Sequence, residues 1–457
     1  MRRVYLIGIG GIGMSALARY YHHEGSVVAG YDKTPSRITA ELEKEGIPIH
    51  FEDNLNQIPE IFKVEIEKSL VIYTPAVPSD MGELCWFREK GYRLIKRSLA
   101  LGEVASSKRT LAVAGTHGKT STSTLLAHIM TSSGKGCTAF LGGISKNYHT
   151  NLLLSKSEYL VAEADEFDRS FLQLWPDTAI ITSTDADHLD IYTNHQNIKD
   201  AFNDFASQVK QGGDLIIKTT IELKGKLSDD VNVYRYSFNE GGDFCAENII
   251  SLDGGYFSFT LKYPKGKIEN CKVGIPGWVN VENGIAAAAA ALLNGVDEEK
   301  VRDALASFQG VERRFDIHIN TPKISYIDDY AHHPKEITAA ISSIREIFPG
   351  RRLTGIFQPH LYSRTRDFAE DFAKSLDMLD ELLLMDIYPA RELPIKGVTS
   401  ETIFNKMELS NKRLVTKENI LNSIDSIDPE ILITFGAGDI DRFIEPIKKL
   451  LKRKYNV

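Results

Sequence analysis

Residues 110–122 read Thr110-Leu-Ala-Val-Ala-Gly-Thr-His-Gly-Lys-Thr-Ser-Thr122, and this stretch decides how the chain folds. The five residues before Gly115 are small, β-branched or apolar, which favours a buried strand. Gly115 and Gly118 predict a tight loop, and the run from Lys119 to Met130 predicts a helix. Such a loop binds anions, because its backbone N–H groups and the positive end of the helix dipole point into it.

The residues of this loop are those of a polyphosphate site. Lys119 can reach the outer phosphates of a nucleotide, and the Thr120 hydroxyl can hold Mg²⁺. The strict Walker pattern requires a glycine where this chain has Val113, so the loop is a variant of that motif. The alternative is an ordinary turn with a surface lysine. The order Gly-Lys-Thr at the junction of strand and helix favours the phosphate site.

Length and composition limit the class of protein. At 457 residues the chain is long enough for about three domains, each with its own core. A charged fraction of 25% and a hydrophobic fraction of 42% are typical of soluble globular proteins. The sequence shows neither an apolar run of membrane-spanning length nor a signal peptide, so we expect a cytoplasmic protein without a membrane partner.

Charge and cysteine usage exclude further classes. The net charge of -8 argues against a nucleic-acid partner, because binding to a phosphate backbone depends on clustered lysine and arginine. The four cysteines lie far apart and form no CxxC pair. This spacing argues against a zinc site and against a disulfide framework.

Residues 4–32 predict a strand, a glycine turn, a helix and a second strand. The turn Gly8-Ile-Gly-Gly-Ile-Gly13 matches G-x-G-x-x-G, and Asp32 ends the second strand, which alone is typical of NAD binding. A UDP-sugar, however, offers the same pyrophosphate and ribose to such a turn. A later strand ends in Thr74-Pro-Ala-Val-Pro78, at the edge of the sheet where ligands bind; a purely structural turn is the alternative there.

Two strands that follow the glycine loop end in acidic and imidazole side chains. These side chains are Glu163, Asp165, Glu166 and Asp168 after the first strand, and Asp185, Asp187 and His188 after the second. The strand ends of an α/β sheet meet in one crevice, so the pattern predicts Mg²⁺ beside the nucleotide phosphates. The alternative is that these acids are ordinary solvated loop residues. Because two such strands occur together, this alternative is less plausible than it would be for either strand alone.

The region after these strands contains few candidate site residues. Residues 213–275 alternate and are interrupted by glycines, which predicts antiparallel strands at one edge of the sheet. An alanine-rich run to Leu293 predicts a tightly packed helix. Asn280 and Asn283 share a face of this helix, so both amides could contact a purine; helix capping explains one of them equally well.

From Gly310 onward, strands and helices alternate, which predicts a third, doubly wound α/β unit. Its strand ends carry three polar clusters, in residues 328–334, 358–364 and 386–392. One histidine is more often structural than catalytic, but three such clusters on one edge favour a site.

The predicted fold is therefore α/β with three domains. They are a Rossmann-like domain at residues 1–107, a P-loop ATP-binding domain with an added β region at 108–312, and a doubly wound domain at 313–457.

Together the motifs resemble the Mur ligase family over the whole chain. The matching segments, in order, are Gly8–Ser15, Gly115–Thr120, Glu163–Glu166 with Asp168, Asp187–His188, Asn280 with Asn283, Arg313–Asp316, Asp328–Pro334 and Phe357–His360. Each segment alone is a weak signal, whereas eight in sequence are specific.

The resemblance implies an ATP-dependent ligase of peptidoglycan precursor synthesis. In that family the N-terminal domain holds the UDP group, the central domain holds Mg-ATP, and the C-terminal domain closes over both and admits the amino acid. The lactyl carboxylate of UDP-N-acetylmuramate would take the γ-phosphoryl group of ATP, and the amine of L-alanine would attack the acyl phosphate. We expect a monomer or a weak homodimer whose substrates are small molecules.

The resemblance also implies residue roles. Thr120 and Glu163 would hold the Mg²⁺ on ATP, and His188 a second Mg²⁺. The candidates for ATP binding are Gly115, Thr116, His117, Gly118, Lys119, Thr120, Ser121, Asn280, Asn283, Arg314 and Asp329. Those for the UDP-sugar are Gly8, Gly10, Gly11, Ile12, Gly13, Ser15, Asp32, Thr74 and His360. The catalytic candidates are Lys119, His188, His332 and Arg364, and His332, His360 and Arg364 would serve the muramoyl and alanine end.

Three features of the sequence depart from the family pattern. Val279 stands where many relatives have histidine, and Leu361 where an arginine is common. Ser183 and Thr184 replace the usual asparagine-threonine pair. The contacts to adenine and to the alanine carboxylate can therefore differ from those of relatives.

Three rival functions stay open at this point. A recycling ligase would join UDP-N-acetylmuramate to a preformed peptide with the same chemistry, but the stretch Gly8–Ser15 favours the alanine-adding branch. An NAD-dependent dehydrogenase built on Gly8–Gly13 leaves the P-loop and the acidic strand ends unexplained. A nucleotide-binding switch module would bind ATP without turning over any sugar nucleotide.

Overall fold

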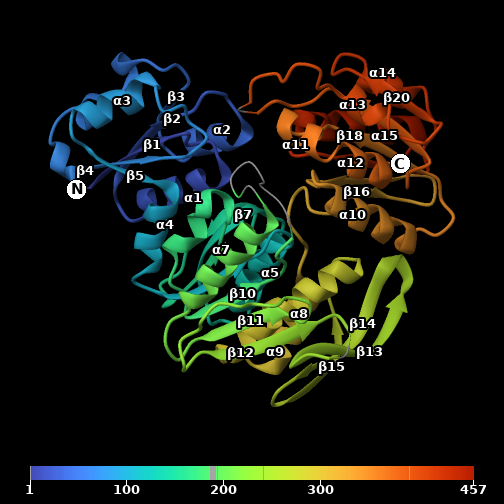
Figure 1. Ribbon diagram of the computed structural model, residues 1–457, viewed down its shortest axis with the longest axis horizontal. Helices are drawn as coiled ribbons and strands as arrows, with labels where there is room; N and C mark the ends of the chain where they lie inside the picture. The colour runs from blue at the N-terminus through green and yellow to red at the C-terminus, as the bar shows by residue number, and fades with distance from the viewer. Residues whose placement is uncertain (1, 186–191, 193, 240, 391) are drawn as a thin grey trace. The chain divides into compact units, whose positions relative to one another are not determined.

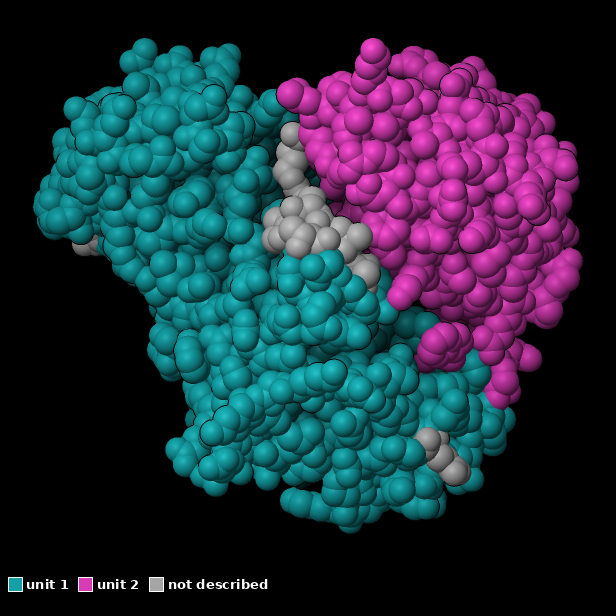
Figure 2. Space-filling view, in the orientation of Figure 1, with its two compact units in different colours: residues 1–250, 257–275, 279–310 teal, residues 251–256, 276–278, 311–457 magenta. Residues whose placement is uncertain are grey.

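The computed structural model describes residues 2–185, 192, 194–239, 241–390 and 392–457. In this part of the chain the strands form three sheets, of five, ten and six strands (Figure 1). The chain divides into two compact units, which comprise residues 1–250, 257–275 and 279–310, and residues 251–256, 276–278 and 311–457 (Figure 2). The first unit holds nearly all of the first two sheets, and the second unit holds the third. The predicted α/β class is confirmed.

The first sheet has the strand order β3-β2-β1-β4-β5, and its strands pair in parallel. Its elements are β1 (Arg3–Ile7), α1 (Ile12–His23), β2 (Val27–Tyr31), α2 (Arg37–Lys44), β3 (Ile49–His50), β4 (Ser69–Tyr73), α3 (Gly82–Glu89), β5 (Arg93–Lys96) and α4 (Arg97–Ala105). Val4 and Leu6 of β1 pack into one hydrophobic cluster. Tyr5 and Ile7, which alternate with them, pack into another. Both faces of β1 are therefore buried, which is why this strand is apolar from Val4 to Ile7.

The second sheet has the order β15-β14-β13-β12-β11-β10-β6-β9-β7-β8. Its strands are β6 (Arg109–Ala114), β7 (Thr138–Ser145), β8 (Thr150–Leu153), β9 (Tyr159–Glu163), β10 (Thr178–Ile181), β11 (Asp214–Lys218), β12 (Asn232–Ser237), β13 (Phe244–Leu252), β14 (Tyr256–Tyr263) and β15 (Gly266–Lys272). Its helices are α5 (Lys119–Ser132), α7 (His195–Ser207), α8 (Trp278–Leu293) and α9 (Glu298–Ser307). β6 lies between β9 and β10 and is parallel to both, so the carboxyl ends of these three strands share one edge.

The prediction of antiparallel strands over residues 213–275 is wrong for the first part of that region. β11 pairs in parallel with both β10 and β12, and β12 pairs in parallel with β13. Only farther along, between β14 and β15, is an antiparallel ladder described. The reason is the connection, because residues 219–231 between β11 and β12 are long enough for a crossover. The continuous apolar run Leu215–Ile217 is also typical of a buried parallel strand.

The alanine-rich segment forms α8, as predicted. Ala286 to Ala291 are each 0% exposed, so the helix is enclosed on all sides at this level. Six consecutive alanines cover every face of a helix with small side chains, which permits close approach of neighbouring elements.

The third sheet has the order β16-β17-β21-β18-β19-β20, with β16 antiparallel to β17 and the other ladders parallel. Its strands are β16 (Asp316–Asn320), β17 (Ser325–Asp329), β18 (Leu353–Phe357), β19 (Glu381–Met385), β20 (Lys412–Val415) and β21 (Ile431–Phe435). Its helices are α10 (Pro334–Ile347), α11 (Tyr362–Asp367), α12 (Ala369–Leu376), α13 (Glu401–Phe404), α14 (Ile420–Asp425) and α15 (Ile444–Tyr455). Separate hydrophobic clusters bury its two faces, which confirms the predicted doubly wound unit.

Short 3-10 helices connect several of these elements. They are η1 (Leu55–Gln57), η2 (Glu60–Phe62), η3 (Ile66–Lys68), η4 (Phe167–Gln173), η5 (Asp253–Gly255) and η6 (Asp439–Phe443). Within the described residues, no helix combines the length and the apolar character that crossing a membrane requires.

Candidate active site

The glycine loop lies between β6 and α5, in the strand–loop–helix arrangement predicted from the sequence. Gly115 and Gly118 have φ of 138° and 81°, values that side-chain-bearing residues rarely adopt. A Cβ atom on Gly115 would lie 2.0 Å from Thr182 Oγ1, and one on Gly118 would lie 2.9 Å from Asn283 Oδ1. Backbone conformation and close packing therefore both require glycine at these two positions.

Lys119 is not a surface lysine, because its side chain is only 13% exposed. Its Nζ donates to the Gly115 carbonyl at 2.7 Å and to the two carboxylate oxygens of Glu166 at 2.9 and 2.7 Å. Burial opposes the charge on the ammonium, but the neighbouring carboxylates, Glu166 foremost, outweigh it and raise the pKa of Lys119. Lys119 is thus a cation held at the start of α5.

The residues after β10 brace the glycine loop. Ser183 Oγ accepts from the His117 N–H at 2.8 Å and lies 2.8 Å from Thr116 Oγ1. The Ser183 carbonyl accepts from the Thr116 N–H at 3.2 Å, and Thr116 Oγ1 accepts from the Asp185 N–H at 3.1 Å. Sequence reasoning recognised Ser183 only as a departure from the family pattern, and this bracing role was missed.

The acidic side chains after β9 divide into two groups. Glu163 lies against β7, since a Cβ atom on Gly142 would come within 2.0 Å of Glu163 Oε2. Asp165 and Asp168 instead pair with α4 and β5. Arg97 donates to Asp165 at 3.1 Å, and Lys96 donates to Asp168 at 2.7 Å. Glu166 contacts Lys119 directly, and Asp165 and Glu163 are also close enough to act on its charge.

The structure describes only some of the predicted metal ligands. Thr120 is buried in the first turn of α5, and Glu163 ends β9. Asp187 and His188 lie outside the described residues. Over the described stretches, no group of three or more His, Cys, Asp and Glu side chains is arranged to hold a metal ion.

Asn283 and Asn280 come from α8. Asn283 is 7% exposed, with its Oδ1 against Gly118, so it borders the phosphate loop as expected for an ATP contact. Asn280 is half-buried and lies almost one turn earlier in the same helix. Ser121 is half-buried beside Thr120 in α5.

The N-terminal glycine turn joins β1 to α1, and its N-cap Gly11 has no side-chain capping bond. Gly8 has φ of 84°, and a Cβ atom there would lie 2.5 Å from Thr74 Cγ2. The glycine turn and the residue after β4 are thus in contact, as expected if both segments border the same ligand. A Cβ atom on Gly13 would lie 2.5 Å from Arg97 Nη1, so this glycine permits close approach of α4.

Two other candidates near this turn, Asp32 after β2 and Ser15 in α1, are engaged within the protein. Asp32 Oδ2 accepts from the Gly10 N–H at 2.8 Å, and its Oδ1 accepts from the Thr34 N–H at 3.1 Å. Ser15 is 0% exposed, and its hydroxyl donates to the Ile12 carbonyl at 2.9 Å. Both side chains therefore shape the turn, a role that the motif alone does not reveal.

In the second unit, Asp329 ends β17 and is half-buried. Its Oδ1 accepts from the Ala331 N–H at 2.8 Å and its Oδ2 from the Phe315 N–H at 3.0 Å. Burial raises the pKa of Asp329 to about 7, although the charge of Arg314 opposes the shift. Arg313 donates to Asp328 at 3.1 Å. The guanidinium of Arg314 lies 5.0 Å from the centroid of the Tyr330 ring, which fixes it near β17.

A row of rings joins the three polar clusters of this unit. The centroids of Tyr330 and His332 are 5.3 Å apart, those of His332 and His360 5.9 Å, and those of His360 and Tyr388 5.9 Å. Arg364 is 7% exposed, and its Nη1 lies 3.4 Å from His360 Nδ1. The prediction that these strand ends share one edge is confirmed. Tyr388 was missed as an individual residue, although its segment was noted.

Leu361 adopts an unusual backbone conformation in this cluster. Its φ of 71° lies in the left-handed region, which is uncommon for leucine. Its N–H donates to the Tyr388 carbonyl at 3.0 Å, and its side chain is 6% exposed. The residue that departs from the family pattern therefore packs inward, while Arg364 supplies the nearby guanidinium.

Comparison with protein families agrees with this geometry. Three models match successive parts of the chain: "Mur ligase family, catalytic domain" over residues 3–109, "Mur ligase middle domain" over 113–291, and "Mur ligase, glutamate ligase domain" over 313–438.

Individual relatives match over nearly the full length. A UDP-N-acetylmuramate–L-alanine ligase from Porphyromonas gingivalis is 53% identical over 99% of both chains. The crystal structure of the UDP-N-acetylmuramate–alanine ligase MurC from Thermotoga maritima has a TM-score of 0.82 and 28% identity, with 100% of both chains covered. A murein peptide ligase from Psychrobacter arcticus shares the fold, with a TM-score of 0.71, 24% identity and 99% of both chains covered.

Proposed function

Because the chain belongs to the Mur ligase family, we propose that it is an ATP-dependent ligase that joins L-alanine to UDP-N-acetylmuramate in peptidoglycan precursor synthesis. The observation that carries this proposal is the full-length similarity to a ligase that uses L-alanine, on a chain whose P-loop lysine lies beside the strand-end carboxylates.

The reaction has two steps. An oxygen of the lactyl carboxylate attacks the γ-phosphorus of ATP, the bond to the β–γ bridging oxygen breaks, and ADP leaves. The uncharged amine of L-alanine then attacks the carbon of the acyl phosphate. The C–N bond forms, the C–O bond to phosphate breaks, and the amine loses a proton.

Lys119 and the loop amides serve the first step. The transferring phosphoryl group needs positioning and charge neutralisation more than covalent help. Lys119 is a cation already fixed at the N-terminus of α5, where its ammonium can contact the γ-phosphate. The Thr116 and His117 N–H groups donate to Ser183, so the backbone N–H groups from Gly118 to Ser121 would hold the remaining phosphates. Asn280 and Asn283 would border the nucleotide.

Thr120 and Glu163 fit a magnesium site. Both offer oxygen donors, which Mg²⁺ prefers, and Mg²⁺ on a nucleotide takes only one or two protein carboxylates. When bound, Mg²⁺ neutralises charge on the phosphoryl oxygens. By family resemblance, His188 would hold a second ion.

The UDP-sugar would occupy the N-terminal turn. The backbone N–H groups at the start of α1 can receive the diphosphate, with the residues from Gly8 to Gly13 giving close approach and Thr74 at the rim. The same motif could accept NAD, but a hydride carrier has no role in the proposed reaction.

The second unit would supply the groups for the amino acid. Arg364 has the planar, always charged fork that suits a carboxylate. His360 lies next to it, and the His332 ring packs against His360. By resemblance, Arg314 and Asp329 would contact ATP. We assign the binding of the UDP-sugar to residues 1–107 and that of Mg-ATP to residues 108–312. Residues 313–457 would bind the amino acid and close over both substrates. We further propose that the enzyme is cytoplasmic and is a monomer or a weak homodimer.

Phosphate release tests the proposal. With ATP, Mg²⁺ and UDP-N-acetylmuramate, the protein should release phosphate steadily when L-alanine is added and only at background without it. The tripeptide that a recycling ligase uses should give no release above background. Release with the tripeptide and none with L-alanine would contradict the proposal in favour of the recycling reaction.

A further inference from the structure

Asn151 of β8 is a buried amide that connects the second sheet to the first turn of α1. The residue is 0% exposed. Its Nδ2 donates to the Ile12 carbonyl at 2.6 Å and to Ser15 Oγ at 2.9 Å, and its Oδ1 accepts from Arg19 Nη1 at 2.5 Å. Both amide hydrogens and the amide oxygen are therefore used on one helix, more than 130 residues away in sequence.

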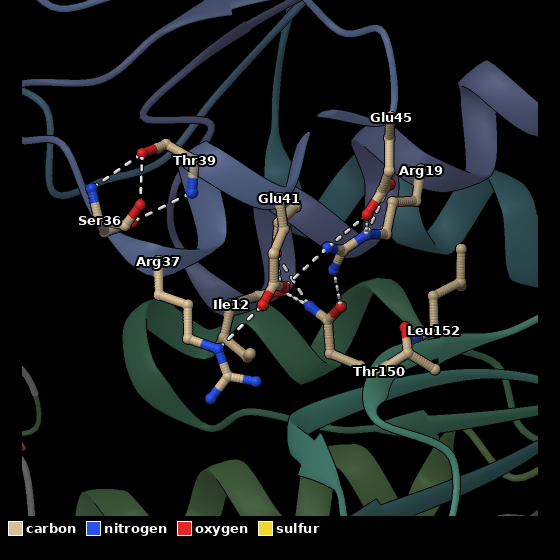
Figure 3. Close-up of polar contacts among 11 residues, drawn as sticks. Ile12, Arg19, Ser36, Arg37, Thr39, Glu41, Glu45, Thr150 and Leu152 are labelled. Atoms are coloured by element: carbon tan, nitrogen blue, oxygen red, sulfur yellow. Dashed lines mark hydrogen bonds and ion pairs between the residues drawn. The ribbon is translucent and has the colours of Figure 1, made fainter. Parts of the chain in front are cut away.

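Arg19 extends this connection to α2. Its Nε donates to both carboxylate oxygens of Glu45 at 2.9 Å, and Nη2 lies 3.4 Å from a Glu41 oxygen (Figure 3). The Arg19 side chain is only 9% exposed, so it is fixed from both ends. Arg37, on the outer side of Glu41, is 66% exposed and pairs with that carboxylate at 2.9 Å.

This arrangement makes the position of α1 specific. A buried amide that lost these partners would carry unsatisfied polar groups, which is costly, so the network is satisfied only when α1 and β8 keep this spacing. Apolar contacts alone would let α1 shift along β8, because they have no preferred direction. The ring contact between Tyr20 and Phe140, at 5.5 Å, lies between the same helix and β7.

We propose that Asn151, with Arg19, is a positioning residue for phosphoryl transfer. The inference rests on the proposed function, in which the turn before α1 holds the UDP-sugar and the loop before α5 holds ATP. Asn151 fixes the turn that holds one substrate to the sheet that holds the other. The lactyl carboxylate thereby meets the γ-phosphate at attacking distance, although Asn151 touches neither substrate.

The proposal predicts a separation of kcat from binding. Asn151→Ala in the full-length protein should lower kcat about 10-fold or more, because a displacement of about 1 Å between reacting groups can cost on the order of 100-fold. The Kd of UDP-N-acetylmuramate, measured by calorimetry without ATP, should change less than about 3-fold, since the diphosphate contacts lie within the first sheet's own turn. Arg19→Gln should show the same pattern to a smaller extent.

Arg37→Gln is the matched control, because it alters the exposed end of the same network, and it should leave kcat and Kd unchanged. If Asn151→Ala fails to fold, Arg19→Gln carries the test. A lower melting temperature with unchanged kcat in the foldable variants would overturn the proposal and leave a purely structural role. A parallel loss of kcat and sugar binding would overturn it too, because Asn151 would then shape the binding turn itself.

Failure of the proposed function would look different. In that case the unaltered protein would not bind UDP-N-acetylmuramate, or Gly11→Val, which places a side chain in the diphosphate position, would not weaken its binding. Either result concerns the site itself and is independent of Asn151.

Discussion

At the scale of single residues, Lys119 has a chemical role and a structural partner. Its ammonium is the proposed contact of the γ-phosphate, and it also neutralises Glu166, which is 1% exposed. Removing one member of a buried ion pair is expensive, whereas replacing both members can be nearly neutral. The two roles can therefore be separated by mutation.

We expect Lys119→Ala to lower ligation about 100-fold or more, as loss of transition-state charge stabilisation does. The same variant should unfold at a lower temperature, because Glu166 loses its ammonium partner inside the protein. Adding Glu166→Gln to Lys119→Ala should restore much of the stability and none of the activity. If Lys119→Ala turned over substrate at nearly the rate of the unaltered protein, the P-loop assignment would be wrong.

Gly142 controls the position of Glu163. An added methyl group would come within 2.0 Å of the Glu163 carboxylate, so Gly142→Ala must displace a proposed magnesium ligand. We expect the Mg²⁺ concentration needed for phosphate release to increase about 10- to 100-fold, or the rate of phosphate release to fall by a similar factor.

The control for this change is Gly266→Ala in β15 of the same sheet. Its new Cβ atom would find its nearest neighbour, on Tyr263, at an ordinary 3.5 Å. If both variants show the same Mg²⁺ dependence as the unaltered protein, Glu163 does not hold the ion.

At the scale of elements, α5 is anchored by a buried histidine. His128 Nδ1 lies 2.9 Å from Tyr148 Oη, and His128 Nε2 lies 3.1 Å from Ser307 Oγ. The three residues join the phosphate-loop helix to α9 and to the turn after β7. Burial lowers the pKa of His128 below its ordinary value.

A lowered pKa makes this anchor sensitive to acid. Between the lowered folded pKa and the unfolded value of about 6.5, the unfolded chain binds more protons, so the free energy of unfolding rises with pH there. The stability that neutral His128 contributes is therefore present above about pH 6.5 and is lost as pH falls toward its folded pKa. Denaturant unfolding between pH 5 and 8 should show a shallower pH dependence in His128→Gln, and identical slopes would contradict the assignment.

At the scale of the whole molecule, the first two sheets share a hydrophobic cluster. It contains Val4 and Leu17 from the first sheet's segment together with Ala112 and Leu160 from the second. The third sheet has two clusters of its own. Cooperative units follow such shared cores.

We therefore expect β1 and β6 to open together in native-state hydrogen exchange, with similar free energies of opening. β21, which belongs to the second unit, should respond to denaturant separately. Asn151→Ala should lower the protection of β1 more than that of β21. Exchange of β1 independent of β6 would show that the shared cluster does not couple the two sheets.

The sequence by itself determined the features that depend on neighbouring residues. The strand, loop and helix over residues 109–132 follow from an apolar run, two glycines and good helix formers, all of which act locally. The same holds for the turn Gly8–Gly13 and for the alternation of elements after Gly310. Because parallel strands deliver their ends to one edge, this local information also predicted that the described candidate residues of each sheet lie near one edge of it.

Only the tertiary structure decided which partners those residues take. Nothing in the local pattern assigns Glu166 to Lys119, Ser183 to the His117 N–H, or Asn151 to Ile12, since these pairs are 47, 66 and 139 residues apart. The same is true of the parallel pairing of β11 with β12, which depends on the path of a crossover and not on the strands themselves. Contacts between distant segments form when the whole chain is packed, because burial leaves each polar group only the partners that packing brings to it.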